Sequence, residues 1–138
     1  MKSVFIDTNV IIDLLADRRP FSKDAERIFL YSSDQEVTLY TSSHTIVTTH
    51  YVLKKFLGEK ELRSILAELM EYLTIIPVTE QILTKSSQSK FSDFEDAVQY
   101  FSATSNSEIS YFITRNIKDF KHAEIPVLAP DEFNMSHL

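Results

Sequence analysis

Short apolar runs alternate along the chain with segments whose apolar residues recur at helical spacing. The apolar and β-branched runs predict buried strands, which we place at 4–6, 37–41, 73–78, 110–114 and 125–128. Apolar residues three or four positions apart predict helices at 10–15, 22–31, 42–57, 61–72, 79–83 and 92–105. Strands that alternate with helices favour a parallel sheet covered on both faces. We therefore expect a single α/β domain spanning residues 1–138.

Residues with helix-capping chemistry indicate where several of these helices begin or end. N-cap candidates are Ser22, Ser42 or Ser43, and Thr79. Gly58 is expected to end the third helix as a C′ residue. Residues 85–90 are expected to form a polar loop, residues 115–122 a turn or short helix, and residues 130–133 a terminal turn.

Composition excludes several classes of function. Gly58 is the one glycine, so glycine-rich phosphate loops and dinucleotide fingerprints are excluded. The absence of cysteine excludes disulfides, thiolate zinc sites and a cysteine nucleophile. Because no apolar run approaches ~20 residues, no membrane span is expected, and we expect a soluble cytoplasmic protein. The net charge of −6 disfavours charge-driven binding of nucleic acid, although divalent cations can bridge carboxylates to phosphate.

Polar residues follow three of the expected strands at their carboxyl ends. The first strand ends in Asp7-Thr8-Asn9 and the second in residues 41–43, whereas Thr114-Arg115-Asn116 follows the strand at 110–114, with Asp119 one short turn later. In open parallel sheets, binding sites form beyond the carboxyl ends of the strands. If these strands are neighbours, their polar ends meet at one edge of the sheet.

An acidic segment begins the helix at 92–105 and supplies further candidates. Ser92 and Glu95 match the capping box S-x-x-E, so we expect Glu95 to serve the helix start. Asp93 falls at the first helical position, where the helix dipole favours negative charge. Asp96 falls at the fourth helical position, past the cap, and has no such local role; it shares a helix face with Asp93, three residues away, and is a candidate ligand.

Clustered carboxylates suit a hard divalent cation. Mg²⁺ and Mn²⁺ prefer oxygen ligands, and Mg²⁺ keeps several waters. Carboxylates held together raise each other's pKa values unless a cation balances their charge. A bound cation can activate water and stabilise charge on a phosphate during in-line displacement. This chemistry needs neither a glycine loop nor a cysteine.

Four segments, in order, resemble PIN domains, including the VapC-type toxin nucleases. They are residues 4–13, 94–97, 113–120 and 125–133, so the resemblance covers nearly the whole chain. The resemblance implies a Mg²⁺- or Mn²⁺-dependent ribonuclease acting on RNA, with a small antitoxin protein as a possible partner and a homodimer as the assembly. It assigns the catalytic and metal-binding roles to Asp7, Asp96 and Asp119, with Asn9, Thr114, Asn116 and Asp93 in support. Between Asn116 and Asp119 for the last acidic position, we favour Asp119 because it is the carboxylate.

One position departs from the family pattern. PIN nucleases usually carry a glutamate on the helix after the second strand, and here that position falls at about Thr48, with no carboxylate anywhere in residues 37–57. His44 or His50 could substitute in part, although imidazole is a poorer Mg²⁺ ligand. The alternative to a nuclease is therefore a degenerate PIN domain that binds nucleic acid or a protein without cutting. A third reading is a phosphohydrolase acting on small phosphate esters.

Overall fold

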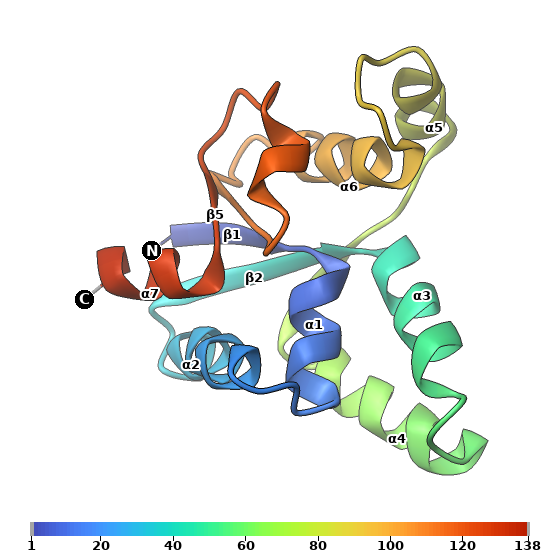
Figure 1. Ribbon diagram of the computed structural model, residues 1–138, viewed down its shortest axis with the longest axis vertical. Coiled ribbons are helices and arrows are strands. Elements are labelled where there is room, and N and C mark those ends of the chain that lie inside the picture. The colour runs from blue at the N-terminus through green and yellow to red at the C-terminus, as the bar shows by residue number, and fades with distance from the viewer. Residues whose placement is uncertain (1, 138) are drawn as a thin grey trace.

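A five-stranded parallel sheet runs through the computed structural model, which describes residues 2–137 (Figure 1). The strands are β1 (Lys2–Ile6), β2 (Val37–Ser42), β3 (Leu73–Ile76), β4 (Tyr111–Ile113) and β5 (Val127–Leu128). Their order is β3-β2-β1-β4-β5, and every neighbouring pair is parallel. The prediction of a parallel α/β domain is confirmed, and the strand order reverses between β1 and β4.

Helices cover both faces of the sheet (Figure 1). One face carries α1 (Thr8–Leu15), α2 (Phe21–Ser33), α3 (Ser43–Leu53), α4 (Glu59–Met70) and α7 (Pro130–His137). The other carries α5 (Glu80–Ser87), α6 (Phe94–Thr104) and the short 3₁₀ helix η1 (Ile117–Phe120). This division follows from the sequence order, because each crossover between parallel strands must pass over a face of the sheet.

The strands are buried on both faces, which explains their continuous apolar runs. Val4 and Ile6 point into one core with α1, α2 and α4, whereas Phe5 between them joins a second core beneath α6. Phe5 stacks on Phe112 of β4 with ring centroids 5.2 Å apart. The two cores hold β1 and β4 side by side, so the residues that follow these strands share one edge of the sheet.

The predicted caps at Ser22 and Gly58 are wrong. Helix α2 begins at Phe21 after Pro20, and the Ser22 hydroxyl donates a hydrogen bond to Asp17 instead of capping the helix. Gly58 has φ −66° and is the N-cap residue of α4, not the C′ residue of α3. Helix α3 has already ended at Leu53, so the glycine belongs to the start of the next helix. The predicted caps at Ser42 and Thr79 are confirmed.

Two segments are more helical than the sequence pattern indicated. Helix α5 continues to Ser87, because Ile82 and Ser86 are buried one turn apart and the Ser86 hydroxyl donates to the Ile82 carbonyl. The expected terminal turn is the helix α7, anchored by Phe133, which is fully buried. Both helices are stabilised by tertiary burial, which a short local pattern does not reveal.

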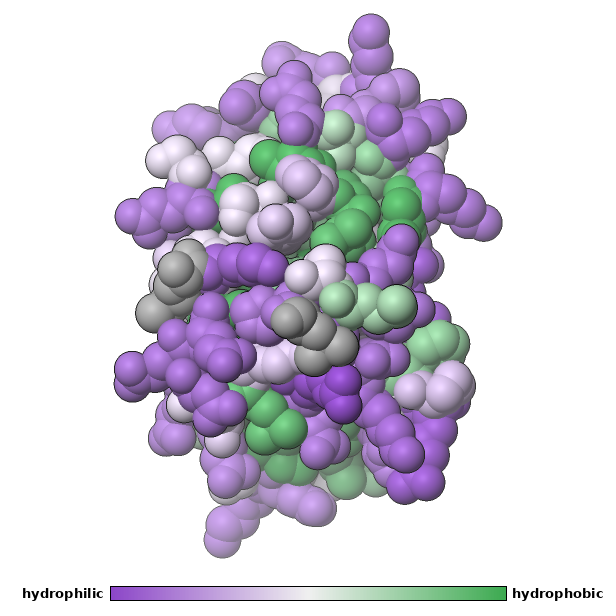
Figure 2. All heavy atoms as spheres, turned by 90° about the vertical axis from the view of Figure 1, so that its left-hand side faces the viewer, coloured by the Kyte–Doolittle hydropathy of each residue, from purple (hydrophilic) through white to green (hydrophobic). Residues whose placement is uncertain are grey.

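The surface near the start of β1 and around α7 is mainly hydrophilic, with separate apolar patches (Figure 2). Among residues 2–137, no helix has both the length and the apolar character needed to cross a membrane.

Candidate acidic active site

Asp7 lies where β1 ends, beside the end of β4, at the point where the strand order reverses. Its backbone N–H donates to the carbonyl of Ile113 at 3.0 Å, and its carboxylate caps α1 by accepting from the Thr8 N–H at 2.8 Å. Asp7 is only 5% exposed. The predicted convergence of strand ends is confirmed for β2, β1 and β4, which are neighbours in the sheet. Such reversal points are the usual ligand sites of parallel sheets.

Several donors surround the Asp7 carboxylate. Gln99 donates to Oδ1 at 3.0 Å, and the Thr114 hydroxyl donates to Oδ2 at 2.9 Å. The Asn9 amide approaches Oδ2 at 3.3 Å. Burial raises the pKa of Asp7, and the hydrogen bonds from Gln99, Thr114 and Thr8 partly offset this effect by stabilising the charged form. The surrounding side chains fix the carboxylate in one orientation.

Three of the supporting residues named from sequence form a hydrogen-bonded network around Asp7. Asn9 and Thr114 contact its carboxylate, and Asn116 contacts Thr114. The Thr114 hydroxyl accepts hydrogen bonds from the Asn9 amide at 3.0 Å and from the Asn116 backbone N–H at 3.1 Å. Asn9 also accepts from the Arg115 N–H, which joins α1 to the loop after β4. Asn116 is exposed, and its carbonyl accepts the N–H of Asp119 at 3.0 Å.

The N-terminus of α6 brings Asp96 to the same edge, although the predicted capping box is wrong. Asp93, not Ser92, is the N-cap residue, and its carboxylate accepts the backbone N–H groups of Glu95 and Asp96 at 2.8 and 3.3 Å. Asp93 therefore precedes the first helical position instead of occupying it, and Asp96 is the third helical residue. The side chain of Glu95 is left without a capping role.

The electrostatics of Asp96 reveal a cluster of negative charge. Burial and the neighbouring charges of Asp93, Asp7, Asp119 and Glu95 raise the pKa of Asp96 to about 7. In the described chain, no side chain donates a hydrogen bond to this carboxylate. Asp119 is exposed on η1 and contributes its charge from the rim. The charges of Asp7 and Asp119 thus both raise the pKa of Asp96, so Asp96 interacts electrostatically with each of the other two carboxylates.

The donor set suits a hydrated hard cation better than a closed protein cage. Within residues 2–137, no three histidine, aspartate or glutamate side chains form a group that could hold a metal ion. Mg²⁺ is commonly bound by one or two carboxylates, with water and substrate phosphate completing its shell. Asp96, whose carboxylate is partly buried near the charges of Asp7 and Asp119, is the residue of this edge best suited to contribute one ligand to such an ion.

The position of the missing glutamate lies next to a histidine–glutamate pair. The Thr48 hydroxyl is 3.2 Å from Nε2 of His44, and the same nitrogen lies 3.1 Å from a carboxylate oxygen of Glu95. A carboxylate from α6 thus reaches the region that lacks one on α3. His50, the other histidine considered from sequence, pairs instead with Glu59 of α4 at 2.8 Å.

Sequence reasoning missed a buried amide beneath the site. Gln99 is 1% exposed, and besides Asp7 its amide nitrogen reaches the hydroxyls of Thr8 and Thr45 at 3.2 and 2.7 Å. Its carbonyl oxygen accepts from the Ser42 hydroxyl. The signal was present in the sequence, because Gln99 lies three residues after Asp96 in an otherwise largely apolar stretch of helix.

An ion pair outside the acidic cluster secures the loop after β4. Asp13 of α1 is 1% exposed, and Arg115 donates to both of its oxygens at 2.5 and 3.1 Å. Arg18 adds a third contact at 3.2 Å, and the Arg115 guanidinium lies 4.0 Å from the ring centroid of Phe21. These contacts anchor the backbone that carries Thr114 and Asn116.

Comparison with known proteins agrees with the class of domain that this fold and acidic edge define. A family model described as the PIN domain matches residues 3–118, and the chain therefore belongs to the PIN domain family. It is 36% identical over 140 residues to Ribonuclease VapC1 of Aquifex aeolicus (strain VF5), covering 96% of this chain and 93% of that protein. The resemblance to VapC-type PIN domains is thereby confirmed.

Solved structures share the fold. VapBC2 from Rickettsia felis, bound to a DNA fragment from its promoter, aligns with a TM-score of 0.68 at 16% identity, over 91% of this chain and 96% of that chain. VapBC-1 from nontypeable Haemophilus influenzae aligns with a TM-score of 0.68 at 21% identity, over 94% and 98%. A toxin–antitoxin complex from Klebsiella pneumoniae aligns with a TM-score of 0.65 at 25% identity, over 92% and 97%.

Proposed function

We propose that this chain is a Mg²⁺- or Mn²⁺-dependent endoribonuclease of the cytoplasm and the toxin of a toxin–antitoxin pair. The observation that carries the proposal is the acidic edge of the sheet, where Asp7 ends β1 beside β4 and the start of α6 adds Asp93, Glu95 and Asp96. Burial, together with the charges of these neighbours and of Asp119, raises the pKa of Asp96 to about 7. A divalent cation bound there would balance this charge and bridge to an RNA phosphate. The name of the VapC1 relative supports RNA as the substrate.

The residues of the chain have distinct tasks in this proposal. Asp7 offers a carboxylate whose direction is fixed by Gln99 and Thr114, so its geometry is set before any ligand arrives. Asp96 on α6 and Asp119 on η1 supply further negative charge near it. When bound, the cation supplies Lewis acidity and a more acidic water for attack on the phosphodiester.

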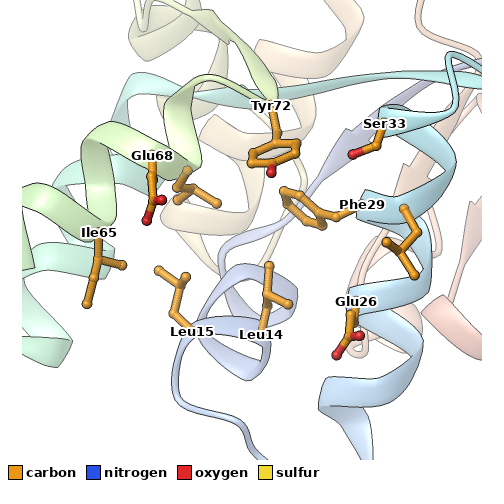
Figure 3. Close-up of a pocket in the computed structure, with 10 residues that line it drawn as sticks. Leu14, Leu15, Glu26, Phe29, Ser33, Ile65, Glu68 and Tyr72 are labelled. Atoms are coloured by element: carbon orange, nitrogen blue, oxygen red, sulfur yellow. The ribbon is translucent and has the colours of Figure 1, made fainter.

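An apolar groove on the helical layer formed by α1, α2 and α4 is the surface we assign to the antitoxin. Figure 3 shows Leu14 and Leu15 facing Phe29 and Ile65 across it, with Glu68 among the other labelled side chains. The cavity has a volume of about 310 Å³. An amphipathic segment with an apolar stripe and basic flanking residues would complement it. The toxin–antitoxin complex from Klebsiella pneumoniae, whose chain is 25% identical to this one, supports such a partner, and the proposal includes the homodimer expected from the family.

A cleavage assay tests the enzymatic proposal. Purified protein is incubated with single-stranded and structured RNAs in Mg²⁺, in Mn²⁺ and in chelator, beside the matched variant Asp7→Asn. We expect internal cleavage that requires the cation and is lost in the variant. Cleavage that survives both chelator and Asp7→Asn would assign the activity to a contaminant or to another site.

Thr48 supports a second candidate, a PIN domain that binds RNA without cutting it. The α3 position that usually carries a glutamate has a hydroxyl, and the Glu95 carboxylate beside it is engaged with His44. The same assay separates the two functions. RNA binding with no cleavage under any cation condition would establish the binding domain and refute the nuclease.

A further inference from the structure

A cavity of about 400 Å³ opens beside the acidic site, where α3, α5 and the start of α6 meet. Its walls are mainly apolar and include Phe94, Val98, Val47 and Leu83, while His44 and Glu95 supply polar groups. Phe94 is 54% exposed, so its ring is available to a ligand. Pockets of this size with apolar walls and a few polar groups are typical small-ligand sites.

The geometry of α6 places this cavity next to the acids. Successive residues of a helix project about 100° apart, so Phe94, Glu95 and Asp96 face three adjoining directions. Phe94 and Val98, one turn later, line the cavity, whereas Asp96 is not among its lining residues and is influenced by the charges of Asp93, Asp7 and Asp119. Glu95 lies between them, because it lines the cavity and its charge also acts on Asp7 and Asp96. The cavity and the acids therefore share the first turn of α6, and an extended ligand bound across this turn would contact both.

The charge of the protein indicates which part of an RNA would occupy the cavity. With a net charge of −6, the chain has little capacity to gain affinity from phosphate contacts. Besides phosphate contacts, proteins that bind single-stranded RNA gain affinity by stacking the bases on aromatic side chains. Phe94 offers such a ring beside the acids, and an uncharged base meets no repulsion from Glu95.

We propose that this cavity binds one nucleobase of single-stranded RNA, adjacent to the phosphate held at Asp7 and Asp96. The inference rests on the ribonuclease activity proposed above and adds the base-binding subsite that positions its substrate. The base stacks on Phe94, and its edge meets the hydrogen-bonding groups of His44 and Glu95. The subsite makes cleavage depend on the identity of a base near the scissile bond.

Removal of single bases tests the subsite. RNA oligonucleotides with one abasic nucleotide at each position around the cleavage site are assayed with the wild type, Phe94→Ala and Phe94→Trp. At one position, base removal should lower kcat/KM of the wild type about 5- to 150-fold, the range for loss of one base–aromatic stack. Phe94→Ala should show a similar loss on intact RNA and no further loss at that position, whereas Phe94→Trp should retain the base effect.

The controls separate this inference from the alternatives. Phe56→Ala removes another exposed phenylalanine, one that does not line this cavity, and should leave kcat/KM unchanged. The subsite would be overturned if, at every abasic position, base removal lowered kcat/KM of Phe94→Ala by the same factor as kcat/KM of the wild type. Dissociation of a dimer by Phe94→Ala, seen by sedimentation, would instead show that a second copy covers the cavity. If the wild type cuts no RNA, the ribonuclease proposal fails. The affinities of the wild type and Phe94→Ala for intact and abasic RNA, measured by fluorescence anisotropy, then test the subsite. If base removal weakens binding equally in both proteins at every position, the subsite is refuted.

Discussion

Replacing Asp96 by asparagine should stabilise the metal-free protein, although it removes a residue assigned to the active site. The pKa of this carboxyl rises from 3.8 to about 7, which corresponds to at most ~4 kcal/mol of unfavourable free energy for the charged form. Partial exposure and the favourable helix dipole at this position both reduce that figure. We expect Asp96→Asn to raise the free energy of unfolding by ~1–3 kcal/mol at pH 8 in chelator.

The pH dependence has a definite sign. Between pH 4 and about 7, folded Asp96 keeps its proton while the unfolded chain has lost it, so the folded state binds more protons and stability falls as pH rises. Above that window both states are charged and the difference is constant. The advantage of Asp96→Asn should therefore be absent near pH 4, grow between pH 4 and 7, and remain constant at pH 8.

Urea unfolding in chelator at several pH values measures this effect. Asp131→Asn is the matched control, because Asp131 is likewise an acid in the first turn of a helix but is exposed, whereas Asp96 is partly buried; its replacement should not stabilise the protein. Addition of Mn²⁺ should stabilise the wild type and leave Asp96→Asn nearly unchanged. A variant less stable than the wild type at pH 8 in chelator would refute the repulsion argument and assign Asp96 a structural role.

Three further substitutions test other parts of the site. Thr48→Glu adds the carboxylate that α3 lacks and should tighten Mn²⁺ binding by calorimetry and raise the cleavage rate; unchanged values would show that Thr48 does not face the cation. Gln99→Leu removes a donor from buried Asp7 and should lower stability by about 1–3 kcal/mol in urea unfolding while reducing cleavage. Asp13→Asn leaves Arg115 without its buried partner and should cost about 3–5 kcal/mol in thermal or urea unfolding; a loss below 1 kcal/mol would contradict the burial argument.

The sequence predicts the sheet and its acidic edge because both depend on local patterns. The strands could be predicted because strands of a parallel sheet are buried on both faces and therefore appear in the sequence as continuous apolar runs. The polar ends of β1 and β4 then meet for a topological reason, and the pairing of Ile6 with Ile113 brings Asp7 beside Thr114. Knowledge of side-chain detail is not needed for that step.

What the sequence could not predict depends on contacts between distant residues. Ser92 and Asp93 are both good caps one position apart, and local chemistry does not decide between them. Glu95 was assigned to the cap, but its partner is His44, 51 residues away in sequence. Gly58 lies between two helices and can end one or begin the next, so its role depends on where α3 stops.

The acidic start of α6 shows how one short segment can serve several chemical tasks. Three acids occur within residues 93–96, and a charge count alone would assign them all to a cation. The helical turn separates them, because Asp93 accepts the backbone N–H groups of Glu95 and Asp96, Glu95 pairs with His44, and Asp96 is influenced by the charge of Asp7. Glu95 is thus close enough to influence the acidic centre and placed to contact a base in the adjoining cavity. Although α3 has no glutamate at Thr48, the Glu95 carboxylate reaches His44 beside that position, so in the proposed function one carboxylate adjoins both the acidic edge and the cavity that would bind a base.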